Sequence, residues 1–488
     1  MIKLIIIELT KIFHKKLIYV VLSLMLIFCL LNNILYYLDY DEEGFYKKEE
    51  KNNTAEIKKL EDKITKYDKN NENDKTMYTS LKTKIDILNL KNNFPKNTWQ
   101  YNKTNDYFYD IIYQRNTYTY LIEDEIKKKE IENTYQEKLT KLTKGDWQYF
   151  LRQEKEELEK KKRELESNLK NTNDALEKEN ISIELEYLSI KLKTINYRLE
   201  NQVLEEKTYL NESLKNWEES TTLVSSLTKK TNLTKEEQNA LSNALANVKV
   251  NEYILKNKQN INKENSLNYE LRTIIEDYEF FIVILILMVA STIICEEFNK
   301  GTIKLLLIKP YSRGKILISK YCTCLFILLL TICFLILIQL GIGSYLFKTE
   351  SLKLPVIVYH FSKKELIEYT IWQYMVIRIL SRLPFYILLL TISFTLSTFF
   401  TSTVVSIMIP MIIYLFDSVI INIGIKYKIT IIKYLLNPNW HFEKYLFGNT
   451  NEIASITIKE SIIICIVYFI ILSICTILYF RKKNIKNI

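Results

Sequence analysis

The chain has 488 residues, of which 48% are hydrophobic and 25% charged, and its formal net charge is +10. The basic excess lies in and beside apolar segments, whereas the long stretch between the first two of these segments nearly balances acid and base. A nucleic-acid partner would require a basic patch on a soluble domain, so this distribution argues against that class of protein. It is typical of the charge that orients a membrane protein.

Several apolar runs are long enough to cross a bilayer, which takes about 20 helical residues. Six such spans are expected, at Leu17–Leu38, Tyr278–Cys295, Tyr321–Leu346, Leu383–Phe400, Val404–Ile423 and Ser461–Phe480. The first is too long for the apolar part of a signal peptide and lacks a small-residue cleavage site, so it is interpreted as a retained helix.

Basic loops set the orientation of these spans. Segment 296–320, EEFNKGTIKLLLIKPYSRGKILISK, separates the second and third spans and is rich in Lys and Arg. Loops of this kind remain in the cytoplasm. Residues 1–16 and 481–488 are also basic, so both termini of this multi-pass cell-membrane protein are expected in the cytoplasm, and residues 39–277 outside.

The inserted stretch 39–277 is predicted to be helical. Neither Gly nor Pro occurs between Gly145 and Gly301, so no strong helix breaker interrupts this part of the chain. Apolar residues recur at alternating spacings of three and four, which predicts a coiled-coil seam, at Leu185, Leu188, Leu192, Ile195 and Leu199. Asn171–Asn173 would be the turn of an antiparallel hairpin. Such a hairpin would serve either as a spacer or as a grip on a substrate or partner.

Three further elements are expected in the insertion. Glu49–Leu90 is predicted to be a charged helix, and Asn92–Tyr120, which is rich in Tyr, a compact cap or loop region. Thr234–Glu237 has the sequence of a capping box and should open a helix over 238–250. The predicted fold is therefore an all-α integral membrane protein with six transmembrane helices and a large extracellular coiled-coil insertion between the first two. Its parts are 1–38, 39–277 and 278–488.

Three charged residues near the later spans are candidates for a transport path. Arg378 and Arg382 precede Pro384, where their long side chains would either reach the outer interface or face an anionic group on the path. Asp417 lies inside the fifth span, where a carboxylate is either functional or satisfied by Ser418 and water. Segment 427–446 would lie at the outer interface or re-enter the bilayer, and the sequence leaves both open.

The chain offers no sequence pattern of an enzyme. It has no GxxxxGK[ST] phosphate loop, GxSxG elbow or HExxH helix, and its three histidines lie in separate segments. No catalytic residue, cofactor or metal ligand is expected, and energy for any transport would come from another protein.

The order of these features resembles the membrane subunits of ABC-2-type ATP-binding-cassette exporters, such as the bacitracin- and lantibiotic-resistance permeases. The resemblance covers about 1–40 and 278–488. Its most specific part is an acidic residue, Gly301–Thr302, a Leu-rich stretch, Pro310 and Ser312–Arg313, followed by Ile316–Leu317 and Lys320. The large insertion departs from that family, whose first external loop is usually short.

The resemblance implies a division of labour between subunits. A separate ATPase would bind ATP and dock on segment 296–320, with help from an interfacial helix over the first sixteen residues, and a second permease copy or paralogue would complete the path. The coupling residues implied are Glu296, Glu297, Lys300, Gly301, Thr302, Lys304, Leu305, Leu306, Pro310 and Arg313. In the alternative reading, the basic residues of this loop serve only to set topology.

The expected function is export of an antimicrobial peptide or a lipophilic compound, with ATP hydrolysed by the partner. The alternative is a membrane-anchored coiled-coil sensor or tether without transport. The substrate, the direction of transport and the choice between homodimer and heterodimer are not encoded in recognisable form.

Overall fold

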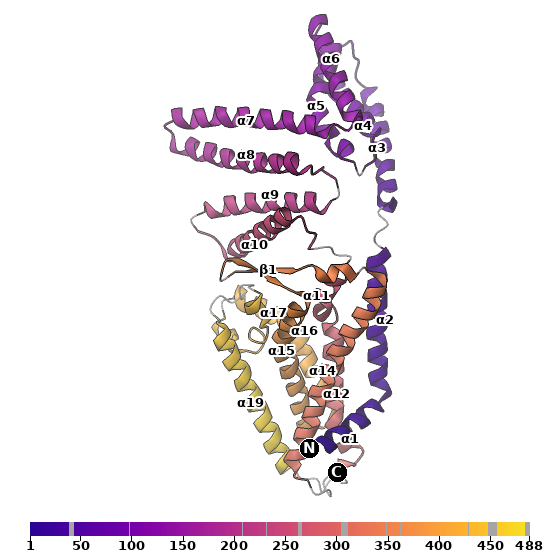
Figure 1. Cartoon of the computed structure of the whole chain (residues 1–488), viewed down its shortest axis with the longest axis vertical. Helices are drawn as coiled ribbons and strands as arrows, with labels where there is room; N and C mark the ends of the chain where they lie inside the picture. The colour runs from indigo at the N-terminus through magenta and orange to yellow at the C-terminus, as the bar shows by residue number, and fades with distance from the viewer. Residues whose placement is uncertain are drawn as a thin grey trace. The chain divides into compact units, whose positions relative to one another are not determined.

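The computed structural model describes residues 1–38, 43–96, 98–206, 208–230, 232–261, 266–303, 311–347, 349–361, 363–427, 429–447 and 456–483. They form two compact units, one of Met1–Leu38 with Ile261–Ile488 and one of Asp39–Asn260 (Figure 1). The division falls before α11 (Leu267–Asp277), which the sequence pattern assigned to the insertion. Leu267 and Leu271 of this helix pack in one cluster with Met375, so α11 belongs to the first unit.

The first unit makes the chain a multi-pass membrane protein. Within the described residues, five helices are long and apolar enough to cross a membrane. They are α2 (Lys16–Leu38), α12 (Glu279–Asn299), α14 (Arg313–Leu346), α15 (Ile371–Phe400) and α19 (Ile458–Lys482). The helices α12 and α15 are the most buried of them and α19 the least, so the unit is built around the α12–α15 pair.

Two of the predicted spans differ from the structure. The expected span Val404–Ile423 is α16 (Thr403–Leu415) followed by α17 (Asp417–Lys426), with a bend of 46° between them. Asp417 opens α17 and turns its carboxylate to a neighbouring loop, which a straight lipid-facing helix could not do. The fourth span, expected at Leu383–Phe400, begins earlier, because α15 starts at Ile371 and continues through Pro384.

Polar side chains join the apolar helices. Ser393 and Ser397 of α15 donate to the backbone oxygens of Leu287 and Ala290 in α12, both at 3.3 Å. Such small residues let two membrane helices approach closely. The side-chain amides of Asn33 in α2 and Gln339 in α14 exchange two hydrogen bonds, of 3.1 and 2.9 Å, and both residues are fully buried. This amide pair ties α2 to α14.

The first unit also contains shorter elements outside the candidate spans. They are α1 (Ile2–Phe13), α11, the 3₁₀ turns η1 (Thr349–Lys353) and η2 (Thr430–Tyr434), and α18 (Glu443–Leu446). A two-stranded antiparallel sheet, β1 (Val356–His360) and β2 (Glu365–Tyr369), pairs Val356 with Tyr369 and His360 with Glu365. This hairpin between α14 and α15 is a departure from the predicted all-α fold.

The inserted unit is helical. Its helices are α3 (Glu43–Ile64), α4 (Glu72–Lys91), α5 (Trp99–Tyr120), α6 (Glu125–Thr143), α7 (Trp147–Asn171), α8 (Ala175–Asn201), α9 (Tyr209–Thr228) and α10 (Lys235–Asn257). The hairpin of α7 and α8 turns at 172–174, one residue later than the predicted 171–173, and the capping box of Thr234 and Glu237 opens α10. Because α8 packs against both α7 and α9, it buries Ile190 and Thr194 as well as the heptad positions Leu188 and Leu192.

Two predictions within the insertion are wrong. The helix expected over Glu49–Leu90 is interrupted between α3 and α4, where the Asn71 side chain caps the second helix. The region Asn92–Tyr120, expected to be a cap or loop, contains the regular helix α5. Phe108 and Ile112 of α5 pack with Leu142 and Phe150 in the core of this unit, because their helical spacing places them on one face.

Candidate functional site

The first candidate site begins with the N-terminal helix α1. Its buried face consists of Leu4, Glu8 and Ile12, which are spaced by four and therefore lie on one side of the helix. This face packs against α14, α12 and α2. A carboxylate on a buried face needs a cation close by, because an unpaired buried charge is very costly.

Two lysines supply that cation and close a ring of charges. Lys320 Nζ of α14 lies 2.8 Å from Glu8 Oε2 and 2.8 Å from Glu297 Oε2 at the end of α12. Lys11 Nζ lies 3.0 Å from Glu8 Oε1 and 2.8 Å from Glu297 Oε1. We call Glu8, Lys11, Glu297 and Lys320 the four-charge ring. It has no net charge, and it joins α1, α12 and α14 at one end of the first unit.

The ring differs from a surface ion pair in its burial. Only 1% of the Lys320 side chain and 5% of the Glu8 side chain are exposed, whereas 45% of Lys11 is exposed. Burial lowers the pKa of Lys11, but the hydrogen bonds and charges of Glu297 and Glu8 outweigh it and hold that pKa above its ordinary value. Lys11 is therefore charged in the folded protein, and it closes the ring on the side that faces water.

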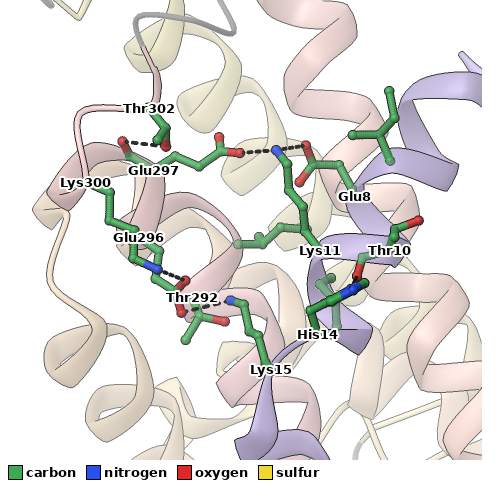
Figure 2. A pocket seen from close by; sticks show the side chains of 13 residues that line it. Glu8, Thr10, Lys11, His14, Lys15, Thr292, Glu296, Glu297, Lys300 and Thr302 are labelled. Carbon is green, nitrogen blue, oxygen red and sulfur yellow. Dashed lines mark hydrogen bonds and ion pairs between the residues drawn. The ribbon is translucent and has the colours of Figure 1, made fainter.

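A second layer of charges surrounds a cavity beside the ring (Figure 2). Lys15 Nζ lies 2.9 Å from Glu296 Oε1, and Lys300 Nζ lies 3.3 Å from Glu296 Oε2. The cavity has a volume of about 730 Å³ and lies between α1 and the end of α12. Figure 2 shows Glu296 between the two lysines and Lys11 between Glu297 and Glu8.

The structure places some of the predicted coupling residues. Glu296, Glu297, Lys300 and Thr302 line the cavity, and Gly301 follows α12 with a φ of +68°, which favours glycine. Arg313 Nη1 donates to the backbone oxygens of Arg481 and Lys483 at the end of α19, at 3.0 and 3.2 Å. Arg313 therefore joins the start of α14 to the end of α19. Lys304, Leu305, Leu306 and Pro310 lie outside the described residues.

The second candidate site unites the three residues proposed for a transport path. Arg378 and Arg382 of α15 and Asp417 of α17 belong to one group of charges, which also contains Glu276, Glu279, His441 and Glu443. We call these residues the buried ion cluster. Arg382 Nη1 lies 3.2 Å from Glu279 Oε2 and 3.3 Å from Glu443 Oε1, and Arg378 pairs with Glu276.

Asp417 is held by the loop that follows α17. Its Oδ1 accepts from Asn437 Nδ2 at 2.8 Å and from Trp440 Nε1 at 3.1 Å, and its Oδ2 lies 2.6 Å from His441 Nε2. Trp440 is fully buried and packs edge to face against Phe385. These contacts give the carboxylate of Asp417 three hydrogen-bonding partners. A cavity of about 270 Å³ adjoins it, lined by Glu279, Phe280, Phe385, Tyr414, Leu415, Asp417, Ser418 and His441.

A groove without charged residues lies beside the buried ion cluster. It has a volume of about 530 Å³ between α15 and α19, and its lining includes Leu380, Pro384, Phe442, Ile462, Cys465 and Phe469. Within the described residues, no group of three or more His, Cys, Asp or Glu side chains could hold a metal ion.

Sequence reasoning missed several members of both sites. Glu8 was detectable as an isolated carboxylate on the apolar face of the first helix, and Lys320 as a cation at the start of an apolar span. His441 and Glu443 gave no such signal, because they follow a Pro-Asn turn whose approach to α15 depends on tertiary packing.

Comparisons with known proteins match the C-terminal half of the chain. A model of the family described as "Protein of unknown function (DUF2705)" matches residues 241–486. The uncharacterized protein YhcI of Bacillus subtilis (strain 168) is 29% identical over 201 residues, which are 41% of this chain and 64% of that relative. The alignment thus spans less than two thirds of the relative's length. No solved structure matches the chain.

Proposed function

This chain belongs to the DUF2705 family, and we propose that it is the membrane-spanning subunit of an ATP-binding-cassette exporter whose ATPase is a separate chain. The observation that carries the proposal is the four-charge ring, which joins α1, the end of α12 and the start of α14. Glu297 and Lys320 lie near the two ends of segment 296–320, the proposed ATPase dock, and α1 packs against both helices. An ATPase-binding segment can transmit force to the membrane helices only when the helices that carry it are held rigidly together as its base.

The ring supports such a base on energetic grounds. Removing one partner of a buried ion pair costs roughly 3 to 5 kcal/mol, because the remaining charge is left uncompensated. Separation of α1 from α12 and α14 would break the Lys320–Glu8 and Lys11–Glu297 pairs, so that Glu8 would lose its buried cation and keep only the half-exposed Lys11. We therefore expect α1 and Glu296–Thr302 to move together with α12 and α14.

A single helix connects this base to the buried ion cluster. Glu279 at the start of α12 contacts Arg382, and Glu297 near its end belongs to the four-charge ring. At 1.5 Å per residue, the two carboxylates are about 27 Å apart along the helix. Motion imposed on one end of α12 would reach the other. This connection favours a transporter over a tether, which needs no link between the two membrane faces.

The substrate class that we propose is a membrane-active peptide or a lipophilic compound. The apolar groove between α15 and α19 offers a surface for such a molecule beside the buried ion cluster. The arginines are paired with carboxylates of the same chain, so they do not serve as free sites for an anionic substrate. A second permease copy or paralogue would complete the path.

The orientation that we propose places both termini in the cytoplasm of the cell and the inserted unit outside. The end of the first unit that carries the four-charge ring also holds basic residues beyond it, and basic flanks stay inside. In a variant without the seven native cysteines, Lys160→Cys should react with an impermeant thiol reagent on intact cells, whereas Lys300→Cys should react only after permeabilisation. Labelling of position 300 from outside would contradict this topology.

The test of the exporter proposal is co-purification with an ATPase. The tagged chain, extracted from its native membrane, should carry a protein with a phosphate-binding loop, identified by mass spectrometry. Leu306→Asp should remove this partner, because burial of an apolar side chain contributes roughly 1.5 to 3 kcal/mol. Lys304→Ala, the control in the same segment, should reduce it only slightly, since an exposed charge contributes about 0 to 1 kcal/mol.

Two results would count against the exporter. If the intact chain carries no ATPase, the tether or sensor becomes the better explanation. If Leu306→Asp retains the full amount of ATPase, segment 296–320 is not the dock and acts only in topology.

A further inference from the structure

His441 is the residue at which three contacts of the buried ion cluster meet. Its Nε2 lies 2.6 Å from Asp417 Oδ2, at the start of α17. Its Nδ1 lies 3.0 Å from Arg382 Nη1 of α15 and 3.4 Å from Glu443 Oε1 of α18. Nε2 therefore faces the Asp417 carboxylate, whereas Nδ1 faces both a donor, Arg382, and an acceptor, Glu443.

The chemistry of the ring decides which of these two partners Nδ1 binds. An ionised carboxylate only accepts hydrogen bonds, so the proton of the neutral ring lies on Nε2 and is donated to Asp417. Trp440 Nε1, which lies 3.1 Å from Nε2 and 3.1 Å from Asp417 Oδ1, then donates to Asp417. Nδ1 of the neutral ring is then an acceptor, and Arg382 can donate to it. The ring thereby connects α17 to α15.

A second proton on the ring, bound at Nδ1, breaks the contact between Nδ1 and Arg382. Both ring nitrogens of a protonated histidine are donors, so Nδ1 can no longer accept from Arg382 and repels its charge. Glu443 Oε1 is then the acceptor within reach. Arg382 already lies 3.2 Å from Glu279 and 3.3 Å from Glu443, so it has carboxylates to turn to without leaving the cluster.

This change of hydrogen-bond partner takes place beside the bend between α16 and α17. Asp417 is the first residue of α17, immediately after the bend of 46° that separates this helix from α16. We propose that His441 is a proton-operated latch at this bend: the neutral ring holds α17 to α15 through Arg382, and the protonated ring releases Arg382 and holds α17 to α18. This inference goes beyond the exporter proposal and does not depend on an ATPase.

The surroundings of the ring set the range in which it responds. The charged and titratable groups that face it are Arg382 of α15, Glu279 of α12, Tyr414 of α16, Asp417 of α17 and Glu443 of α18. Burial lowers the pKa of His441, but its hydrogen bonds to Asp417 and Glu443 outweigh burial and hold that pKa above the ordinary value. The latch should therefore change state at a higher pH than an ordinary histidine would and be protonated in mild acid.

The experiment measures the protonation of the His441 ring and the distance between α15 and α17 in the same protein. The full chain, without its native cysteines and reconstituted in lipid nanodiscs, carries nitroxide labels at Val376→Cys of α15 and Val419→Cys of α17, both exposed positions. The distance distribution between the labels should differ between about pH 8 and about pH 5. Its midpoint should equal that of the His441 Cε1 signal in a ¹³C-histidine sample, which has only three histidines to assign.

Variants separate the latch from a passive histidine. His441→Gln should abolish the pH dependence of the distance. Glu443→Gln should move the midpoint to lower pH, because its amide oxygen still accepts a hydrogen bond but no longer carries the negative charge that stabilises the protonated ring. A control pair at Phe326→Cys of α14 and Val376→Cys should report the same distance at both pH values. The latch is refuted if the α15–α17 distance ignores pH, if His441→Gln retains the change, or if the control pair changes equally.

Discussion

Lys320→Met should loosen α1 from the first unit and lower the stability of the folded protein by roughly 3 to 5 kcal/mol. Lys320 Nζ pairs with both Glu8 and Glu297, and its side chain is 1% exposed. Methionine has nearly the same length and fills the space, so the change removes the charge and little else. Lys11 alone would then face two carboxylates, of which Glu8 is almost fully buried.

Thermal unfolding of the purified protein, together with the rate of proteolysis at the junction of α1 and α2, would measure this effect. Lys300→Met is the matched control, because its side chain is 69% exposed and its pair with Glu296 is a surface contact worth about 0 to 1 kcal/mol. Glu8→Gln added to Lys320→Met should recover part of the loss, since it removes the uncompensated charge. Equal stability of the Lys320→Met and Lys300→Met variants would show that the four-charge ring does not hold α1.

Apolar periodicity and helix caps predicted most of the architecture, because both depend on residues close together in the chain. The spans α2, α12, α14 and α19, the turn of the α7–α8 hairpin and the cap of α10 all follow from such local signals. The aromatic helix α5 was missed, since Tyr and Phe are also frequent in strands and irregular regions and their helical spacing was not used. The β1–β2 hairpin was missed because a strand pair gives little signal between two long helices.

The candidate sites were predictable only in part. Arg378, Arg382 and Asp417 were identifiable as charges in or beside apolar segments, and the structure brings them together. Their partners were not identifiable, because Glu443 and His441 are ordinary polar residues of a loop until that loop folds against α15. The bend before Asp417 has the same origin: hydrogen bonds from Asn437 and Trp440 hold a carboxylate that a continuous membrane helix would have to expose to lipid.

Arg382→Met should be far more damaging than Arg378→Met, although the two arginines lie one turn apart on α15. Arg382 is 11% exposed and neutralises two buried carboxylates, Glu279 and Glu443, whose side chains are 16% and 10% exposed. Loss of Arg382 removes the arginine that pairs with both carboxylates, so we expect a destabilisation of roughly 3 to 5 kcal/mol. Arg378 pairs mainly with Glu276, which is 44% exposed and can be hydrated when its partner is removed.

The comparison is sharp because helix, residue type and substitution are the same, whereas the acidic partners differ in number and burial. Thermal unfolding in one detergent should rank the proteins as wild type, then Arg378→Met, then Arg382→Met. Adding Glu443→Gln to Arg382→Met should raise stability, since it removes one of the two orphaned charges, whereas adding Glu276→Gln should change it little. If the two single variants unfold at the same temperature, the carboxylates around Arg382 are solvated through the adjoining cavity, and the buried ion cluster would have to be treated as an open, water-filled part of the membrane unit.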